Sequence, residues 1–381
     1  MAMWIDGSTA QELQRAPVRK FVAGRGNVVL EGTDRPALRN KLYGLAYEKC
    51  IPIGAAIEIT LKCNLRCVHC YNLDRSASPP KEKVLDELRP DEVTRLIDEL
   101  AEAGSLYVCF TGGEPLLHPN ILDYVRHARR RRFAVKLKAN GTLLTPRRVA
   151  DLAEAGVMAV DVSIYGASAA VHEAFTAVPG SFVRAIEGIK IASEAGFDVR
   201  ISCVMHEAAA DEIEGLFELA EKLDTCVVLD PEIRSRNDGD ADPRVHQLCR
   251  DKLLALYEGP LRALLPEPDP SPDRSVQCNC ARSTVGISST GDVYPCISAP
   301  VRAGNIREAT FTEIWRSSPV LERIRKLRLE DFKDCVSCTD RPYCRRMSGY
   351  VYANTGNYTG AEAWLCMEAE VLRRVHEQTN A

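Results

Sequence analysis

The sequence predicts an α/β protein built from parallel βα units, followed by a smaller and irregular C-terminal domain. Three observations support this fold class. Strand-like and helical runs alternate from residue 53 to about residue 258, prolines then interrupt the pattern, and the rest of the chain has short runs, glycines and cysteines. Alternating strands and helices are typical of a parallel sheet, either as an open sheet or as a partial barrel.

Six apolar, β-branched runs are predicted as the strands of this sheet. They cover residues 55–61, 105–110, 133–138, 157–164, 197–204 and 225–229. The clearest helix between them runs from Pro90 to Leu100, because proline and acidic residues open it, apolar residues recur at spacings of three and four, and Gly104 follows. Further helices are expected at residues 119–132, 146–155, 181–195 and 211–223. In such folds the chemistry collects at the carboxyl ends of the strands.

The remaining segments divide the chain into parts. Residues 1–52 form an N-terminal segment of uncertain role, in which residues 20–30 predict a hairpin and residues 38–47 predict a short helix. Five prolines between residues 259 and 275 predict a stiff connector. The predicted domains are therefore residues 53–258 and residues 276–381.

Composition excludes several classes of protein. With 45% hydrophobic and 27% charged residues, the 381-residue chain resembles an ordinary globular protein. A net charge of -4 gives no reason to expect nucleic acid or a membrane as a partner. The start of the chain does not resemble a signal peptide, and no apolar run is long enough to span a membrane. We therefore expect a cytoplasmic protein.

Fifteen cysteines are the unusual feature of the composition. Without an export signal, metal binding or redox chemistry is favoured over disulfides. Cys109 and Cys203 lie inside predicted strands and are interpreted as small buried residues. The others include three at positions 63–70 and seven between residues 278 and 366.

The first group is Cys63-x3-Cys67-x2-Cys70, directly after the first predicted strand. Thiolates this close on one loop cannot pair without strain, but all three can bind one metal cluster. A four-iron cluster held by three thiolates keeps one iron free. Three unrelated buried cysteines, or part of a zinc site, are the alternatives.

This triplet resembles the signature of the radical SAM superfamily. Thr111-Gly-Gly-Glu-Pro115 follows the second strand and resembles the GGE element of that family, and Asn140-Gly-Thr follows the third strand. The resemblance implies a partial (β/α)6 barrel and a [4Fe-4S] cluster that binds S-adenosyl-L-methionine (SAM). It also implies cofactor contacts by His69, Gly112, Gly113, Glu114, Asn140 and Ser163.

The resemblance also implies the chemistry. In this family the reduced cluster cleaves SAM to methionine and a 5′-deoxyadenosyl radical, which removes a hydrogen atom from the substrate. The cofactor performs the difficult step, while the protein fixes the geometry and excludes water. An external reductant such as flavodoxin or ferredoxin is expected. No general base can be named from the sequence.

The C-terminal cysteines resemble the SPASM auxiliary-cluster domain, which implies one or two auxiliary iron–sulfur clusters. One implied ligand set is complete: Cys335, Cys338, Cys344 and Cys366. The other has Cys278, Cys280 and Cys296, because Met347 and Ser348 stand where the family has a further cysteine. This set could hold a cluster with an open iron, a cluster with a non-cysteine ligand or fewer irons, or no cluster. Spacing alone also allows a zinc knot in this tail.

Proteins of this kind commonly modify peptide or protein side chains, and this is the function expected here. The alternative is a small-molecule enzyme, such as a dehydrogenase, an epimerase or an enzyme of tetrapyrrole side chains. A third possibility is a non-enzymatic iron–sulfur scaffold, which the intact triplet argues against. Ile297 replaces the aspartate of sulfatase-maturing relatives and argues against formylglycine formation. Tyr350, Tyr352 and Tyr358 lie near the cysteine-rich tail, where a packing role is favoured.

Overall fold

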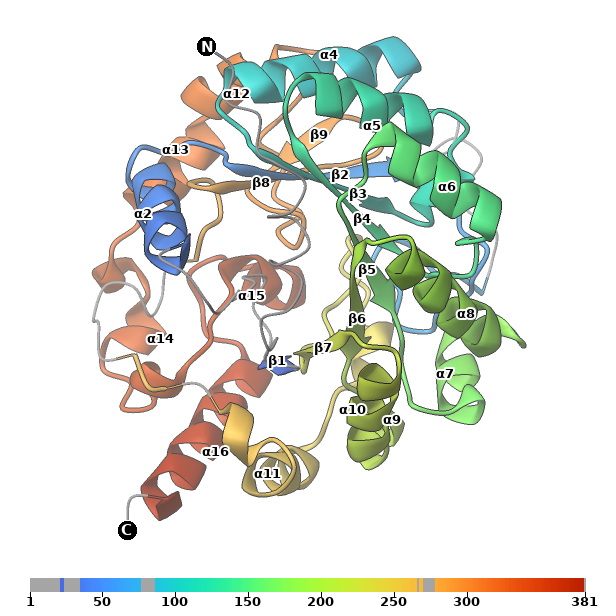
Figure 1. Ribbon diagram of the computed structural model, residues 1–381. Coiled ribbons are helices and arrows are strands. Elements are labelled where there is room, and N and C mark those ends of the chain that lie inside the picture. Colours follow the sequence, from blue (N-terminus) through green and yellow to red (C-terminus); the bar gives the residue numbers. More distant parts are fainter. Residues whose placement is uncertain (1–20, 24–34, 77–85, 266, 270–277, 380–381) are drawn as a thin grey trace.

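The computed structural model of the protein describes residues 21–23, 35–76, 86–265, 267–269 and 278–379 (Figure 1). Ten strands in this part of the chain form one sheet, in the order β1-β7-β6-β5-β4-β3-β2-β8-β9-β10. Helices lie along its outer side in Figure 1. No helix among these residues is long and apolar enough to cross a membrane.

Six consecutive strands form the predicted parallel sheet, each within two residues of the bounds expected from the sequence. They pair in chain order, so each strand lies beside the next. The sheet does not close, because β2 and β7 lie five steps apart in the order. The prediction of a partial (β/α)6 barrel is confirmed. The strands are β2 (Gly54–Thr60), β3 (Tyr107–Gly112), β4 (Ala134–Ala139), β5 (Ala159–Ser163), β6 (Asp198–Val204) and β7 (Cys226–Asp230).

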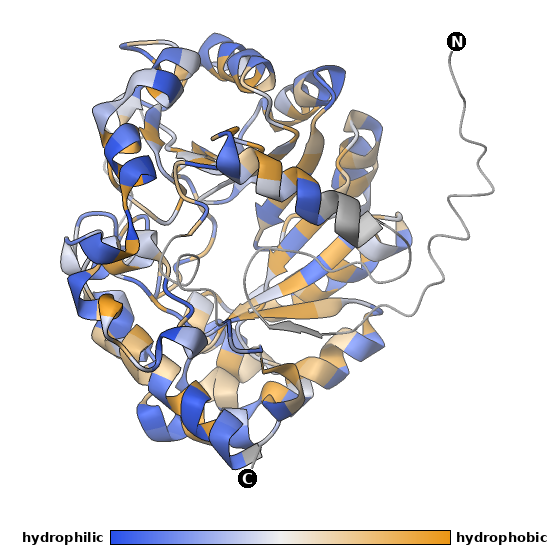
Figure 2. Cartoon of the chain, turned by 90° about the vertical axis from the view of Figure 1, so that its left-hand side faces the viewer, coloured by the Kyte–Doolittle hydropathy of each residue, from blue (hydrophilic) through white to orange (hydrophobic). Residues whose placement is uncertain are grey.

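The helices between these strands bury one apolar face each. In the first, Val93, Leu96, Ile97 and Leu100 are buried at the spacing that the sequence predicted. Figure 2 shows mainly hydrophobic strands inside and helices of mixed hydropathy outside. The predicted helices are α4 (Pro90–Glu102), α5 (Ile121–Arg130), α6 (Pro146–Ala155), α8 (Ser181–Glu194) and α10 (Ile213–Lys222). Two short helices were not predicted: α7 (Ala169–Thr176) and α9 (Glu207–Asp211).

The N-terminal segment differs in part from its prediction. The predicted helix is present as α2 (Arg35–Glu48). The first half of the predicted hairpin is a strand, β1 (Phe21–Ala23), which pairs in parallel with residues 227–229 of β7. Its second half, residues 27–30, lies outside the described residues. β7 would otherwise present an unpaired edge, and β1 supplies the hydrogen-bonding partner for that edge.

The C-terminal half, by which we mean residues 278–379, continues the barrel sheet. The sequence did not predict this continuation. β8 (Thr284–Ile287) pairs in parallel with β2, and β9 (Asp292–Tyr294) and β10 (Gly304–Asn305) follow as antiparallel strands. This half is also more helical than expected. Its helices are α12 (Phe311–Ser317), α13 (Pro319–Lys326), α14 (Lys333–Val336), α15 (Ser348–Thr355) and α16 (Ala363–Thr379). Short 3₁₀ turns are η1 (Pro115–Leu117), η2 (Asp242–His246), η3 (Arg262–Leu264), η4 (Leu329–Asp331) and η5 (Arg341–Tyr343).

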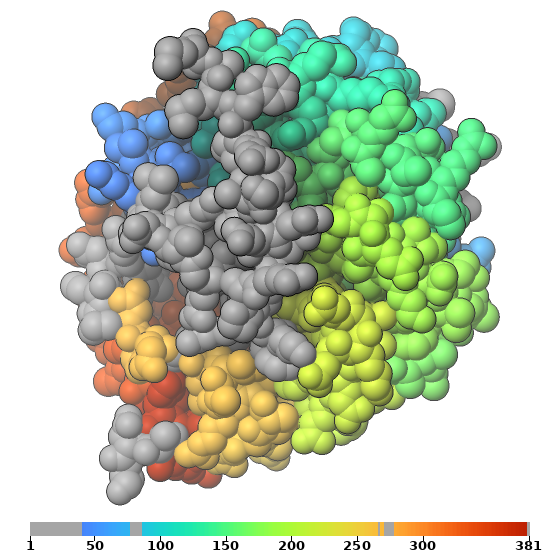
Figure 3. Space-filling view, viewed as in Figure 1, coloured from blue at the N-terminus to red at the C-terminus, as the bar shows by residue number. Residues whose placement is uncertain are grey.

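The C-terminal half reaches both edges of the open barrel. At one edge β8 extends the sheet beside β2, and at the other α16 packs against α11 (Arg250–Glu258), which follows β7. The indole of Trp364 donates to the Leu248 carbonyl at 2.8 Å. In Figure 3 the orange and red C-terminal atoms lie on the left, opposite the green barrel helices. The C-terminal half therefore covers the open side of the barrel.

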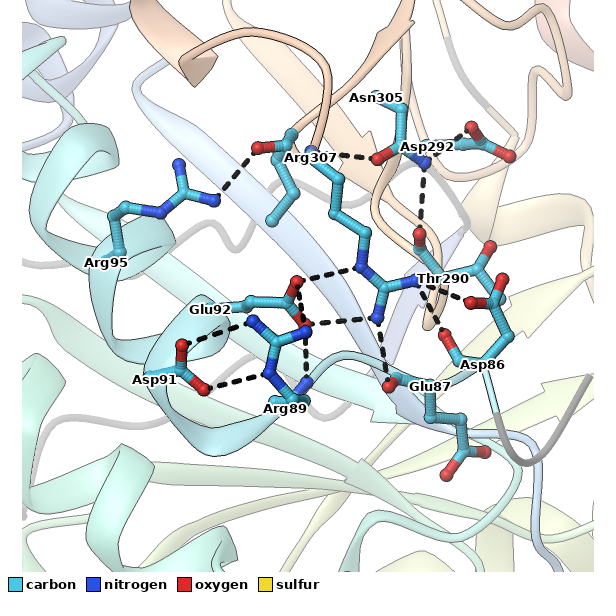
Figure 4. A network of polar contacts seen from close by, with 11 residues as sticks. Asp86, Glu87, Arg89, Asp91, Glu92, Arg95, Thr290, Asp292, Asn305 and Arg307 are labelled. Carbon is cyan, nitrogen blue, oxygen red and sulfur yellow. Dashed lines mark hydrogen bonds and ion pairs between the residues drawn. The ribbon is translucent and has the colours of Figure 1, made fainter.

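One arginine joins the two halves near the start of the barrel (Figure 4). The guanidinium of Arg307 donates to both carboxylate oxygens of Glu92 on α4, at 2.8 and 3.0 Å, and to the Asp86 carboxylate at 2.6 Å. It also donates to the Glu87 carbonyl at 3.2 Å. The Glu87 carboxylate in turn accepts from the N–H of Leu61, two residues before Cys63, at 2.6 Å. Arg307 thus connects the C-terminal half to the cysteine loop.

Candidate active site and cluster-binding residues

The cysteine triplet lies on the loop after β2, at the carboxyl end of the barrel strands. Cys63, Cys67 and Cys70 are free thiols that line one cavity. Burial and the neighbouring Cys63 and Cys70 thiolates raise the pKa of Cys67 well above its usual value. The three sulfurs therefore lie close enough to repel one another as anions, and a cationic cluster would relieve that repulsion.

A buried arginine that the sequence did not single out lies beside the triplet. The Nε of Arg75 donates to the Cys70 sulfur at 3.3 Å, and its Nη1 donates to the Leu61 carbonyl at 2.7 Å. Arg75 is 7% exposed. It follows the loop by five residues in a stretch without a recognisable motif, so no sequence signal identified it.

Gly112 and Gly113 are explained by close backbone contact. A Cβ on Gly112 would lie 2.4 Å from the Thr60 carbonyl oxygen, and one on Gly113 would lie 2.1 Å from that of Lys62. Gly112 also has a φ of +130°. The Gly113 N–H donates to the Thr60 carbonyl at 2.7 Å. The glycine pair therefore holds the cysteine loop against the end of β3.

Glu114 lies behind this contact and is fully buried. Its carboxylate accepts from the backbone N–H groups of Leu116 at 3.1 Å and Asn140 at 2.8 Å. Burial raises the pKa of Glu114 to about 7, although the two N–H donors oppose that shift. Glu114 is not among the described residues that line the cavity, so here it joins the ends of β3 and β4.

Asn140 connects the cysteine loop to β4. Its amide donates to the Asn64 side-chain oxygen at 2.8 Å, and its own oxygen accepts from the Thr142 hydroxyl at 2.7 Å. The Asn64 amide donates to that same hydroxyl at 2.8 Å. Asn64 is a further positioning residue, which the sequence could have suggested only through its place between Cys63 and Cys67.

His69 belongs to an aromatic cluster on one side of the cavity. Its ring stacks on Phe175 with centroids 4.3 Å apart and meets Tyr165 edge-on at 4.6 Å. Burial lowers the pKa of His69 to about 3, so the imidazole is neutral at physiological pH. Its buried Nδ1 has no hydrogen-bond partner among the residues that the structure describes. This neutral ring suits a ligand with a heterocyclic base. Such a base can stack on the imidazole and donate a hydrogen bond to the unsatisfied Nδ1.

The cavity itself has a volume of about 370 Å³ and is lined by both halves of the chain. The barrel contributes Ser163 from the end of β5, together with the three cysteines and both glycines. The C-terminal half contributes Ile297, Met347 and Tyr350. The predicted cofactor residues at 69, 112, 113, 140 and 163 all line this cavity. Its size falls in the usual range for small-molecule sites.

Three buried polar side chains, Tyr71, Glu58 and Arg234, lie between the triplet and the first auxiliary cysteines. The hydroxyl of Tyr71 donates to the Glu58 carboxylate at 3.2 Å, and the Arg234 guanidinium lies 4.2 Å from the centre of the Tyr71 ring. Burial lowers the pKa of Arg234, whereas the nearby Tyr71, Glu58, Cys296 and Cys70 favour its charge. Arg234 therefore lies between the two cysteine groups, on the wall of the cavity.

The structure brings together both predicted sets of auxiliary cysteines. The Cys280 thiol forms hydrogen bonds with Cys278 and Cys296, and the lowered pKa of Cys278, about 5, reflects its hydrogen bond with Cys280. Cys335, Cys338, Cys344 and Cys366 also lie near one another, since mutual repulsion contributes to the raised pKa values of Cys344 and Cys366.

These residues fit the implied cofactors. In the described part of the chain, no three His, Cys, Asp or Glu side chains form a site for a single metal ion. A cubane differs from such a site because each thiolate binds its own iron. The thiols are free and grouped, and the buried Arg75 donates a hydrogen bond to one of them, Cys70. They therefore provide suitable donors for a cluster. The glycine cradle and the unsatisfied His69 Nδ1 suit a ligand in the cavity.

Comparison with known proteins agrees with this chemistry. The profile of the radical SAM superfamily matches residues 57–220, and that of SPASM, an iron-sulfur cluster-binding domain, matches residues 278–340. An AdoMet-dependent heme synthase of Methanosarcina barkeri is 31% identical over 81% of this chain and 95% of that protein. The PqqA peptide cyclase of Rhodopseudomonas palustris is 28% identical over 76% of this chain and 79% of that protein.

Solved structures share the fold at lower identity. Streptococcus suis SuiB bound to its precursor peptide SuiA has a TM-score of 0.59 and 16% identity, over 94% of this chain and 87% of that chain. The structure of anSMEcpe with bound AdoMet has a TM-score of 0.60 and 17% identity, over 86% and 99% of the two chains. From these matches and from the grouped cysteines, this chain belongs to the radical SAM superfamily and carries a C-terminal SPASM domain, with the [4Fe-4S] clusters that these domains bind.

Proposed function

We propose that this radical SAM enzyme modifies a side chain of a peptide or protein. The observation that carries the proposal is the shared cavity. Cys63 and Ser163 from the barrel, and Ile297 and Met347 from the C-terminal half, line the same space. A substrate in that space would meet the SAM site on one side and the SPASM domain on the other. Relatives that act on peptides support the choice of substrate, namely a PqqA peptide cyclase and the mycofactocin maturase MftC of Mycobacterium ulcerans.

In this proposal, different residues bind the cluster, contact SAM and position these groups. When bound, the cluster and SAM would supply the abstraction of a hydrogen atom from the substrate. Cys63, Cys67 and Cys70 hold that cluster, and Arg75 balances the charge of their thiolates. The Gly112–Gly113 backbone shapes the pocket for the methionine moiety, while His69 and Ser163 contact the adenosine. Glu114 positions these groups from behind the cavity, and Asn140 does so from the cavity wall. A flavodoxin or ferredoxin delivers the electron in the cytoplasm.

Tyr350 forms part of the cavity wall and is not proposed as a base. Its hydroxyl lies 2.6 Å from the Ile233 carbonyl and 3.0 Å from the Gln247 side-chain oxygen. Burial and nearby carboxylates raise its pKa far above the usual value, so the phenol keeps its proton.

The origin of the hydrogen atom tests the choice of substrate. Anaerobically reconstituted protein would be incubated with SAM, dithionite and a peptide pool from cells grown in heavy water. We expect deuterium in the 5′-deoxyadenosine, and none with the Cys63→Ala variant. If the wild-type protein forms 5′-deoxyadenosine that carries no deuterium, a peptide substrate is contradicted.

A second candidate is chemistry on a tetrapyrrole. One specific observation favours it: the heme synthase of Methanosarcina barkeri is 31% identical, and this chain spans 95% of its length. The same assay with a deuterated tetrapyrrole precursor of heme distinguishes the two candidates. Deuterium transfer from the tetrapyrrole, but not from the peptide pool, would replace the proposed function with this one.

A further inference from the structure

One cation that lines the cavity, Lys138, has no part in the contacts of the cofactor residues. It lies on β4, where buried apolar residues alternate with two lysines: Val135, Leu137 and Ala139 are buried, whereas Lys136 and Lys138 are not. Because successive side chains of a strand point to opposite faces, both lysines lie on the face that lines the cavity. Lys138 is exposed there, although β4 lies in the middle of the sheet between β3 and β5. The barrel therefore presents an ammonium group to the inside of the cavity.

Two arginines that line the same cavity are already held by protein groups. Arg75 donates to the Cys70 sulfur at 3.3 Å, and Arg234 donates to the side-chain oxygen of Asn237 at 2.9 Å. In contrast, Lys138 forms no hydrogen bond or ion pair with any residue that the structure describes. Lys138 is therefore a cation of the cavity whose partner has to come from elsewhere.

The carboxylate beside Lys138 on the neighbouring strand belongs to the other lysine. In the register of β4 and β5, Lys138 lies directly beside Asp161. One oxygen of Asp161 nevertheless accepts from the Lys136 ammonium, at 2.7 Å. The other oxygen is buried and has no hydrogen-bond partner in the described part of the chain, so Lys138 does not reach it. The ammonium of Lys138 is therefore directed away from this pair and into the cavity.

Asp230 adds a negative charge to the cavity at the end of β7, three strands away from β4. Its carboxylate accepts from the Glu232 N–H at 3.2 Å and forms no ion pair with Lys138. The two charges attract each other across the cavity, since Lys138 opposes the rise that burial gives to the pKa of Asp230. A ligand group beside Lys138 thus also meets the field of Asp230, which favours a singly charged anion over a phosphate dianion.

We propose that Lys138 selects the substrate by binding one of its carboxylates through the ammonium group inside the cavity. The inference rests on the proposed function, because it takes this cavity as the place where the substrate binds. A carboxylate that replaces water around the ammonium gains a charged hydrogen bond. An acidic side chain of a peptide and a carboxylate of a tetrapyrrole share this chemistry. The carboxylate of SAM is the competing occupant, and the experiments below separate it from the substrate.

The first test needs no substrate. The full chain, reconstituted anaerobically and saturated with SAM, would be acetylated briefly with N-acetoxysuccinimide, and the modified lysines would be quantified by peptide mass spectrometry. Glutarate is the carboxylate probe, and glutaramide at the same ionic strength is its neutral control. We expect glutarate to slow the acetylation of Lys138 at least about twofold once half of the sites are occupied, and glutaramide to have no effect. Lys222 on α10, which is exposed and pairs with Glu218, should react equally in all samples.

Three results of this test would overturn the proposal. Equal effects of the two probes would show that the charge of the carboxylate does not matter. No effect of either probe would show that Asp230 alone balances Lys138. If SAM alone blocks the acetylation of Lys138 and glutarate adds nothing, the lysine belongs to the cofactor site.

The second test uses the deuterium-labelled peptide pool, before and after its carboxyl groups are converted to amides. We expect deuterium in 5′-deoxyadenosine only from the untreated pool. Lys138→Met should raise the pool concentration for half-maximal transfer by about tenfold to a hundredfold, with a smaller change in the maximal rate. Lys138→Arg should restore most of this loss, and Lys222→Met is the matched control. The affinity for SAM, measured by equilibrium dialysis, should be the same in Lys138→Met and in the wild type.

Equal transfer from the amidated pool, or an equal loss of SAM affinity in Lys138→Met, would refute the role of Lys138. Failure of the proposed function gives a different result, namely transfer from the deuterated tetrapyrrole alone. The free acid of that tetrapyrrole and its methyl ester would then be compared with the same variants. If no substrate transfers deuterium, or if Lys138→Met does not fold, the acetylation of the wild type decides alone.

Discussion

The guanidinium of Arg75 donates a hydrogen bond to the Cys70 sulfur at 3.3 Å, and this buried cation lies beside all three thiols of the cysteine triplet. A fixed positive charge beside a cluster favours its reduced form, since reduction adds negative charge. The Leu61 carbonyl holds the other end of the guanidinium at 2.7 Å, so the charge cannot turn away. Arg75 therefore orders the loop, and we expect it to raise the reduction potential of the cluster.

Replacing Arg75 with methionine should lower the reduction potential of the SAM-binding cluster. A unit charge at about 8 Å in an effective dielectric of about 20 contributes roughly 2 kcal/mol. This corresponds to a decrease of roughly 90 mV for a one-electron couple, at 59 mV per tenfold change in equilibrium constant. Potentiometric titration followed by electron paramagnetic resonance measures it. Arg75→Lys should restore most of the shift, and an unchanged potential in Arg75→Met would refute the tuning role.

Gly113→Ala should disrupt the SAM site, because its Cβ would lie 2.1 Å from the Lys62 carbonyl oxygen. The cysteine loop would have to move away from β3, and we expect SAM affinity to fall at least about tenfold, or 1.4 kcal/mol. Equilibrium dialysis of the reconstituted protein measures the affinity. Gly54→Ala on β2 is the matched control, since a Cβ there would meet no atom of the described residues within 4 Å. Equal affinities in the two variants would contradict the packing argument.

Glu114→Gln should remove a pH dependence of stability. Burial raises the folded-state pKa of Glu114 to about 7 from a usual value of 4.5, so the folded protein holds this proton more tightly than the unfolded chain. Stability then falls as pH rises from about 4.5 to about 7, by up to about 3 kcal/mol. Anaerobic denaturant unfolding of the metal-free protein at pH 5.5 and pH 8 should show a smaller pH effect in Glu114→Gln. A variant with the wild-type pH dependence would be inconsistent with a buried neutral Glu114.

Arg307→Met should loosen the contact between the two halves. It removes charged hydrogen bonds to Glu92 and Asp86, at a cost of about 2 kcal/mol of stability. Arg307 lowers the pKa of Glu92, so this contribution is present at neutral pH and is lost as pH falls through that lowered value. Hydrogen exchange should increase in residues 86–92. Arg302→Met is the control, because Arg302 pairs with Asp292 and Glu308 inside the C-terminal half. Similar exchange in both variants would exclude a connecting role for Arg307.

The barrel strands and the cysteine sets were predictable because local patterns encode them. β-branched runs mark β2 to β7, and the spacing of Cys63, Cys67 and Cys70 follows from ligands on one loop. Contacts between distant segments were not predictable. The pairing of β8 with β2 and of β1 with β7 depends on unpaired sheet edges, which no local pattern reveals. Arg75 and Arg234 lie beside the cysteine triplet only because of the fold, and an isolated arginine carries no signal of its own.

Cleavage of SAM by the Cys63 cluster is the central claim and can be measured directly. The reconstituted protein would be incubated anaerobically with dithionite and SAM, and 5′-deoxyadenosine would be quantified by liquid chromatography and mass spectrometry. We predict 5′-deoxyadenosine from the wild type and none above background from Cys63→Ala, while Cys203→Ala, which changes a buried cysteine that belongs to neither the cluster sets nor the cavity lining, should retain the activity. Equal amounts from the wild type and Cys63→Ala, or none from either, would contradict the assignment of a radical SAM active site to this cavity.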